Sequence, residues 1–438
     1  MRRALLTALL LAACATPAPA LAPRDEARRL LGARSWPEAV KLLEQLHREA
    51  PGDVELARLL AEAHVKNGSG PLLLERLTGR EDAIACFQRG LIRFATARDA
   101  GGPAIDEFRK AVRAAPQEPE LHYRLGLALL ESEADAEART ELERAVSLAP
   151  DHPGWFLPLA KARGRVGDHD GAVQALHRVV DAGPTEAELA TARALMEQLT
   201  ATRLPETARA RFEQGLQWLQ VADVPQQAIV AFEEVLQDFP DLPEVHSVLG
   251  LAYLRIDDAA RAVDELQRAI ELAPKDGRPH LYLGQLYLGK QRTAQAREQL
   301  EKAVALNPLL DDAWTALGDL ALDRRDGAEA KRCYRAWVSL APRSFPPRGK
   351  LALVLQQEAD WAGAQRQLEQ ALEHEPENAE VWLRLGLLHT DHAQHARGTA
   401  EREAAKTQGV RWLQKVLEQQ PENAMASQAL ALLTAARP

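Results

Sequence analysis

Cysteine, aromatic side chains and clusters of basic residues are all scarce in this sequence. Its 438 residues include three cysteines, too few for a disulfide framework, and only 5% of them are aromatic. The formal net charge is −9, and the chain has no run of Lys and Arg. Such a chain offers no electrostatic attraction to nucleic acid or to an anionic membrane surface. We therefore expect neither as a partner.

Long apolar stretches are absent as well, apart from one near the N-terminus. Ala4–Ala13 (ALLTALLLAA) is uncharged but is too short for the roughly 20 residues of a membrane-spanning helix. In the chain as a whole, 46% of the residues are hydrophobic and 27% are charged. This composition fits neither a disordered chain nor a polytopic membrane protein. The abundance of Ala and Leu indicates packed helices, because these residues lose little freedom in a helix.

Two arginines precede the apolar stretch, as in secretory signal peptides. The stretch ends in Leu11-Ala12-Ala13-Cys14, which resembles the lipobox of bacterial lipoproteins. The resemblance implies a signal peptide at 1–13, lipidation of Cys14 and a Pro/Ala tether at 14–23. Residue 15 is Ala and not Asp, which implies an outer-membrane lipoprotein facing the periplasm. Cleavage at Ala20–Ala22 is the alternative and would give a soluble periplasmic protein.

A 34-residue period runs through most of the chain. Prolines recur at this spacing at 116, 150 and 184, and again at 240, 274, 308, 342 and 376. Between them lies one recurring sequence pattern, for example PEVHSVLGLAYLRIDDAARAVDELQRAIELAP at Pro243–Pro274. We count Pro243 as position 1. The residues at positions 4, 7–8, 11, 20, 24, 27 and 32 then resemble the pattern of large, small and apolar residues of the tetratricopeptide repeat. These residues are His246, Leu249, Gly250, Tyr253, Ala262, Leu266, Ala269 and Pro274.

The resemblance implies an all-α, right-handed superhelical solenoid of about eleven helix-turn-helix repeats with a C-terminal capping helix. Positions 4, 7, 8 and 11 form one helical stripe and positions 20, 24 and 27 form another. Small residues at positions 8 and 20 would let the two helices of a repeat approach closely. Position 8 is Gly at 90, 126, 250, 284, 318 and 386. Position 20 is Ala at 39, 104, 138, 172, 228, 262, 296, 330 and 364, and Gly at 409.

The stretch GQLYLGK at 284–290 has the outline of a phosphate-binding loop. The period places Gly284 at position 8 of a first helix, with Gly289 and Lys290 in the turn before the second helix. A phosphate loop needs free backbone N–H groups between a strand and a helix, whereas these would be used inside a helix. The sequence therefore predicts no nucleotide site, and no cofactor is expected.

The period breaks in three places. The step from Pro51 to Pro116 is short, and residues 67–82 are expected to form a loop with a shortened second helix. Residues 185–200 predict a lone helix, after which we place a boundary between an N-terminal solenoid at 24–202 and a C-terminal one at 203–438. One continuous superhelix is the alternative. The step from Pro376 to Pro421 contains eleven extra residues, about three helical turns, within an insertion at about 390–406.

The insertion region carries the histidines His389, His392 and His395. Three-residue steps turn them around a helix, so His389 and His395 should not converge on one metal ion. A two-histidine site with Asp391 or Glu401 is the alternative, but we predict a solvated helix extension and no metal site. No motif of the common hydrolases, zinc enzymes or dinucleotide-binding proteins occurs. The chain is therefore predicted not to be an enzyme.

The remaining candidate for function is the surface of the first helices. In the resembled family, positions 2, 5, 9 and 12 line a concave groove, which suits a helix or extended segment of a partner protein. In the alternative interpretation, some of the leucines at these positions only pack against neighbouring helices and do not contact a partner. The predicted groove residues are Leu251, Leu254, Leu281, Leu288, Asp312, Asp319, Leu322, Asp323, Leu353, Leu383 and Leu387.

The resulting functional hypothesis is a non-catalytic scaffold or adaptor of a bacterial cell-envelope assembly, such as secretion, pilus formation, polysaccharide export or outer-membrane biogenesis. A chaperone-like carrier of exported chains is the first alternative. A metal-dependent envelope enzyme that uses residues 389–403 is the second. The membrane is expected to take part only through the N-terminal lipid.

Overall fold

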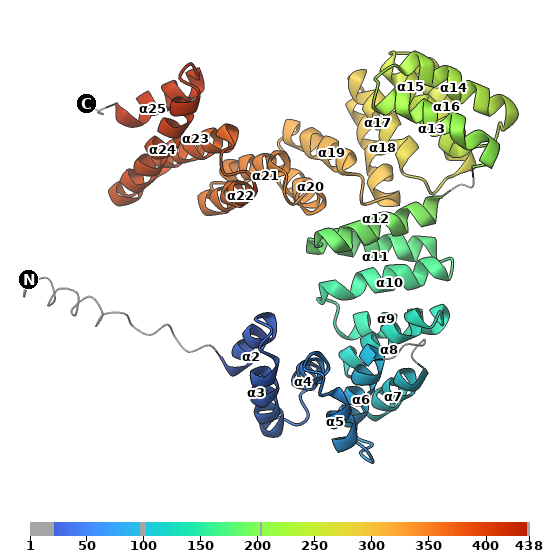
Figure 1. Ribbon diagram of the computed structural model, residues 1–438. Helices are drawn as coiled ribbons and strands as arrows, with labels where there is room; N and C mark the ends of the chain where they lie inside the picture. Colours follow the sequence, from blue (N-terminus) through green and yellow to red (C-terminus); the bar gives the residue numbers. More distant parts are fainter. Residues whose placement is uncertain (1–21, 97–101, 202–203, 436–438) are drawn as a thin grey trace, which may run out of the picture. The chain divides into compact units, whose positions relative to one another are not determined.

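The computed structural model describes residues 22–96, 102–201 and 204–435, which form helices and no strand (Figure 1). The predicted signal peptide and Cys14 lie outside these residues, and Pro23 begins the first described helix. In the described ranges, no helix combines the length and the apolar character that crossing a bilayer requires. The chain divides into two compact units, residues 1–167 and 168–438. This division does not coincide with the boundary expected after residue 202, so separate domains at 24–202 and 203–438 stay a prediction.

The first unit holds nine α-helices and one 3-10 turn in its described part. They are α2 (Pro23–Gly32), α3 (Trp36–Glu49), α4 (Val54–Lys66), α5 (Gly70–Arg76), α6 (Ala83–Thr96), α7 (Gly102–Ala114), α8 (Pro119–Glu131), α9 (Asp135–Leu148), η1 (Pro153–Trp155) and α10 (Phe156–Arg165).

The second unit continues the helix pairs in its described part. Its helices are α11 (His169–Ala182), α12 (Glu186–Thr200), α13 (Glu206–Gln220), α14 (Pro225–Asp238), α15 (Pro243–Arg255), α16 (Ala259–Leu272), α17 (Arg278–Gly289), α18 (Thr293–Leu306), α19 (Asp311–Asp323), α20 (Gly327–Leu340), α21 (Phe345–Gln357), α22 (Trp361–His374), α23 (Ala379–His395), α24 (Thr399–Gln419) and α25 (Ala424–Thr434).

The close approach predicted between the two helices of a repeat is confirmed. All nine alanines at position 20 are at most 1% exposed. A Cβ atom added to Gly250 would lie 2.6 Å from Leu266 Cγ, and one added to Gly318 would lie 2.5 Å from the Tyr334 ring. Because such distances are too short for real Cβ atoms, a side chain at position 8 would push the second helix away. Gly is therefore required at these two sites, whereas Ala352 occupies position 8 of a repeat whose position 24 is Leu368.

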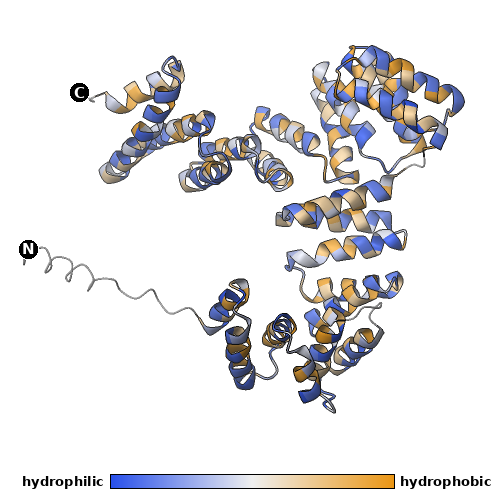
Figure 2. Ribbon diagram, in the orientation of Figure 1, coloured by the Kyte–Doolittle hydropathy of each residue, from blue (hydrophilic) through white to orange (hydrophobic). Residues whose placement is uncertain are grey.

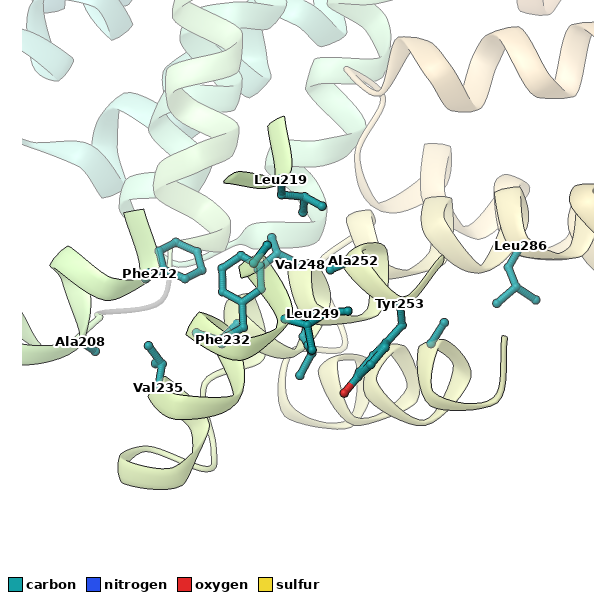
Figure 3. Close-up of a cluster of buried hydrophobic side chains, with 14 residues drawn as sticks. Ala208, Phe212, Leu219, Phe232, Val235, Val248, Leu249, Ala252, Tyr253 and Leu286 are labelled. Atoms are coloured by element: carbon teal, nitrogen blue, oxygen red, sulfur yellow. The ribbon is translucent and has the colours of Figure 1, made fainter. Parts of the chain in front are cut away.

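These pairs join into continuous apolar cores. Figure 3 shows one that begins on α13 and α14 with Phe212 and Phe232 and continues through Leu249 and Tyr253 of α15 to Leu286 of α17. The helices carry hydrophobic and hydrophilic residues side by side (Figure 2), as expected when one stripe is buried and the other solvated.

Position 4 has a second role that the packing argument did not predict. In five repeats its side chain hydrogen-bonds to the carbonyl oxygen of the proline that ended the preceding repeat. Trp314 Nε1 donates to the Pro308 carbonyl at 2.8 Å, and Trp382 Nε1 donates to Pro376 at 3.1 Å. His122, His246 and Arg348 contact Pro116, Pro240 and Pro342 in the same way. The proline lies just beyond the end of the preceding helix, so this bond gives its carbonyl a partner and links consecutive repeats.

The turn between the helices of a repeat is also periodic. Its position 15 has a positive φ angle, a conformation that favours glycine. Yet only Gly68 and Gly167 among the described positions of this kind are glycine. The others are Arg34, Glu133, Asp223, Asp257, Gln291, Arg325 and Ala359, with φ between 51° and 60°.

The irregular segments follow the sequence expectations. The shortened second helix is α5, and the lone helix is α12, which begins with a capping box between Thr185 and Glu188. The insertion makes α23 four residues longer than the 13-residue α15 and α24 seven residues longer than the 14-residue α16. These additions account for all eleven extra residues. The final helix, α25, packs on α23 and α24 as the predicted cap.

We predict that Ala359→Gly stabilises the protein. Ala359 has a φ angle of 60° and no side chain that could offset the strain. A left-handed non-glycine residue costs about 1–2 kcal/mol, and glycine avoids most of this at an entropic cost of about 0.5–1 kcal/mol. The urea midpoint should therefore rise slightly. Ala362→Gly, at an exposed position inside α22, is the matched control and should lower it. Equal decreases in both variants would contradict the strain argument.

A second prediction concerns pH. His246 Nδ1 lies 2.6 Å from Glu265 Oε2 and Nε2 lies 2.8 Å from the Pro240 carbonyl, so only the protonated ring can donate to both acceptors. Burial by itself would lower the pKa of His246, but the bonds to Glu265 and Pro240 raise it overall. A raised folded-state pKa stabilises the protein fully below the unfolded value of about 6.5, and the contribution is lost as pH rises through the folded pKa.

Glu265→Gln should therefore destabilise the protein more at pH 5.5 than at pH 8, by about 1 kcal/mol. The measurement is urea unfolding followed by circular dichroism at both pH values. The next repeat provides the reference, because His280 faces the neutral Gln299 and burial lowers its pKa. Gln299→Glu should add the pH dependence that Glu265→Gln removes. A Glu265→Gln effect that is the same at both pH values would refute this assignment.

Candidate functional site

The predicted groove residues lie on first helices that contact one another in the second unit. Contacts join α15 to α17, α17 to α19, α21 to α23, and α23 to α25. Positions 2, 5, 9 and 12 of these helices form what we call the inner face. Its composition decides whether a partner could bind there.

Most leucines of the inner face are partly covered by their neighbours. Leu281 is only 5% exposed and offers almost no surface to a partner. The others are partly buried, and several of them pack against the apolar cores of adjacent repeats. They are Leu251, Leu254, Leu288, Leu322, Leu353, Leu383 and Leu387. The inner face therefore has an apolar floor of limited depth, because its leucines also join neighbouring first helices.

The three predicted aspartates differ in their surroundings. Asp312 and Asp323 are exposed. Loss of part of its hydration by nearby protein atoms, together with the adjacent Asp311, raises the pKa of Asp312. Asp319 is half-buried and accepts hydrogen bonds from Tyr334 Oη at 2.6 Å and from Lys350 Nζ at 2.8 Å. Its charge is therefore balanced by the first helix of the next repeat. Only Asp312 and Asp323 remain suited to an acidic margin.

Polar residues at position 2 also pair across repeats. Arg278 Nη2 lies 2.8 Å from Asp276 Oδ2, and Arg278 Nη1 lies 3.7 Å from Glu244 Oε1 on the preceding first helix. Asp276 is buried, so this arrangement is held firmly. Sequence spacing alone could not reveal these pairs, because they depend on how successive repeats stack.

A row of surface pockets, called hollows below, lies where the inner face meets the turns between the helices. Each lies between the turn of one repeat and the end of the next first helix, and they measure about 220, 620 and 530 Å³. The first contains Leu254 and the second contains Leu322 and Asp323, all predicted groove residues. The third contains Trp361 and Gln356. Hollows that recur with the repeat could receive regularly spaced side chains of an extended or helical segment.

Two inner-face residues were missed by the sequence reasoning. Met425 and Leu432 on α25 are 61% and 62% exposed, which is unusual for large apolar side chains. They occupy positions 2 and 9 of the capping helix, and counting on from Pro421 would have identified them. The inner face therefore continues to the last helix.

The histidines of the insertion do not form a three-ligand site. His392 Nε2 contacts Glu401 Oε1 at 2.9 Å, and His395 Nδ1 contacts Asp391 Oδ1 at 3.0 Å. Both rings stack on Trp361, whereas His389 is buried, and burial lowers its pKa. In the ranges that the structure describes, no group of three or more His, Cys, Asp or Glu residues could hold a metal ion.

The phosphate-loop outline at 284–290 is part of a helix end. The sequence predicted a turn at Gly289 and Lys290. Gly289 is instead the last residue of α17, so the turn comprises residues 290–292. The backbone N–H groups of Lys290, Gln291 and Arg292 donate to carbonyl groups of α17. Lys290 Nζ bonds to Asp257 Oδ1 at 2.7 Å. The N–H groups that a phosphate would need are therefore already used.

Comparison with known families identifies the repeats. Family models described as Tetratricopeptide repeat match residues 223–286 and residues 24–71, 104–153, 281–345 and 350–406, more than half of the chain. No curated protein matches the sequence.

Solved structures match this chain at low sequence identity and with TM-scores below 0.5. Pseudomonas aeruginosa PilF has 18% identity and a TM-score of 0.42, with 52% of this chain and 97% of that chain covered. PilW, described as a widely conserved type IV pilus biogenesis factor, has 13% identity, a TM-score of 0.41 and coverages of 52% and 100%. The Cut9–Hcn1 assembly has 12% identity, a TM-score of 0.40 and coverages of 94% and 96%. Similarities of this size carry no functional argument.

Proposed function

Because the chain belongs to the tetratricopeptide repeat family, we propose that it is a non-catalytic scaffold or adaptor that binds a segment of another protein along its inner face. The recurring hollows carry this proposal, since they offer the same kind of recess in successive repeats. An enzyme needs converging reactive groups, whereas a regular row of recesses suits an extended or helical chain.

The partner segment should combine apolar anchors with a few basic residues. Leu254 and Leu322 line two of the hollows, and Asp312 and Asp323 are exposed beside the apolar floor. Apolar anchors mainly set affinity, whereas charges at the margin mainly set the association rate and its salt dependence. Met425 and Leu432 would provide further apolar contact at the C-terminal end of the face.

The proposed setting is a bacterial cell-envelope assembly, with Cys14 as the lipid anchor in the outer membrane. The apolar stretch behind two arginines and the lipobox-like Leu11–Cys14 support this proposal. The same inner face would also suit a chaperone-like carrier of exported chains. An adaptor binds one partner, whereas a carrier binds many chains, so the number of captured proteins separates the two functions.

To test the inner face, a photo-crosslinking residue is placed at Asp323 or, as a control, at the exposed Gln370 on the outward side of α22. We expect one protein to be crosslinked in cells from position 323 only. Leu254→Ala with Leu322→Ala should weaken that crosslink about tenfold or more, whereas Asp312→Asn should weaken it less. The affinity of the identified partner is then measured on purified proteins without the crosslinker, for the leucine double variant and for Asp312→Asn with Asp323→Asn.

Crosslinks confined to position 370, with normal binding by both double variants, would show that the inner face is not the site. Many crosslinked proteins at position 323 would favour the carrier.

The anchor is tested separately. Cys14→Ala should leave the protein unprocessed or in the soluble fraction, because the lipidated residue is missing. Membrane fractionation and mass spectrometry of the mature N-terminus provide the measurement. A wild-type protein that is soluble and begins at Pro23 would show that the lipoprotein assignment is wrong and that the alternative cleavage site is used.

A further inference from the structure

Helices α11 and α12, residues 169–200, make contacts that a simple solenoid does not contain. Repeats normally touch only their neighbours, whereas α11 packs against α20, about 150 residues further along the chain (Figure 1). We call α11 and α12 the arm. It belongs to the second unit, which begins at Asp168.

Polar contacts attach the arm to three consecutive repeats. Asp170 Oδ1 lies 2.9 Å from Lys275 Nζ, just beyond α16. His177 Nε2 lies 3.4 Å from the carbonyl oxygen of Ala305 in α18. Arg193 Nη2 donates to the Leu340 carbonyl at the end of α20 at 3.3 Å. Glu186 Oε1 lies 2.5 Å from Nε of Arg343, just beyond α20.

The surface beneath the arm differs from the matching surface of other repeats. Position 26 faces outward and holds Glu234, Arg268, Lys302 and Gln370 in α14, α16, α18 and α22, all of them exposed. In α20 the same position is Ala336, which is only 6% exposed. Leu340 is 2% exposed, although the matching Leu272 and Leu306 are half-buried. The outward side of α20 is therefore apolar and covered.

The arm has a complementary surface. Helix α11 buries seven of its residues, whereas the second helix α16 buries three. Val173 and Val180 lie on the same side of α11 as His177, the residue that contacts α18. Acidic residues flank this stripe, and each faces a cation: Asp170 faces Lys275, Asp181 lies near Arg332, and Glu186 faces Arg343.

We propose that the outer face of α20 is a docking surface for an acidic amphipathic helix, and that the arm is its built-in occupant. The apolar centre is Ala336 and Leu340, and the basic margin is Lys275 and Arg343. A partner helix with small or β-branched apolar residues flanked by carboxylates takes this place when the arm leaves. This surface lies on second helices, so it is independent of the inner face.

The ion pairs of the arm are exposed, which allows displacement. Asp170 and Lys275 side chains are 74% and 51% exposed, and those of Glu186 and Arg343 are 53% and 70% exposed. Such pairs orient a helix but hold it weakly in water. Charge reversal at these positions should therefore loosen the arm without damaging the fold of the repeats.

The test uses a single thiol as a reporter of coverage. In the full chain with Cys14→Ala, Cys86→Ala and Cys333→Ala, Ala336→Cys places one thiol beneath the arm, and its alkylation rate by iodoacetamide is measured. Asp170→Lys with Glu186→Lys should raise that rate roughly tenfold. Adding Lys275→Glu with Arg343→Glu should restore the slow rate. The reporter Gln370→Cys, at the matching exposed position of α22, should react quickly in every background.

A synthetic peptide of residues 168–200 then tests docking from outside. Added to the charge-reversed protein, it should slow alkylation at position 336 again and leave position 370 unaffected. The same peptide carrying Asp170→Lys and Glu186→Lys should not protect. An unchanged alkylation rate after charge reversal would show that these contacts do not hold the arm over α20. Faster alkylation that the wild-type peptide fails to slow would show that the surface accepts no external helix.

Discussion

The structure depends on one steric constraint, the close contact of the two helices within each repeat. At Gly250 and Gly318 there is no room for a Cβ atom, and the alanines at position 20 are fully covered. Every other feature presupposes this contact. A left-handed residue at position 15 reverses the chain between the two helices, and the remaining sides of both helices stay available for neighbours.

Contacts between repeats combine apolar packing with directional polar bonds. The hydrogen bond from position 4 to the preceding proline carbonyl, as at Trp314 and Trp382, is polar and directional. So are the pairs that Asp319 and Arg278 make across adjacent first helices. Apolar packing thus brings helices together, while these bonds set how one repeat is oriented on the next. The inner face results from both, because stacking covers its leucines and balances part of its charge.

The fold could be predicted from the sequence because the 34-residue period repeats the same local constraint many times. Gly284 illustrates this, since the period alone identified it as a helix contact. The site could be predicted only in part. Leu281 has the right spacing for a groove residue but is buried, and Asp319 has the right spacing for a margin but is bonded to Lys350. Both outcomes depend on the stacking of different repeats. The packing of the arm was harder still to predict. Its only sequence signal is Ala336, which occupies a position that is charged or polar in the other regular repeats.

The eleven-residue insertion shows how such a chain can gain length without losing its architecture. Four residues are about one helical turn and seven are about two, so both lengthened helices keep their buried stripes in phase with the rest of the stack. The cap α25 still packs on α23 and α24. New side chains such as His392 and His395 are thereby added at the tip of a hairpin. A solenoid of this kind tolerates insertions in whole turns, and each such insertion gives evolution a protruding surface on which to select new contacts.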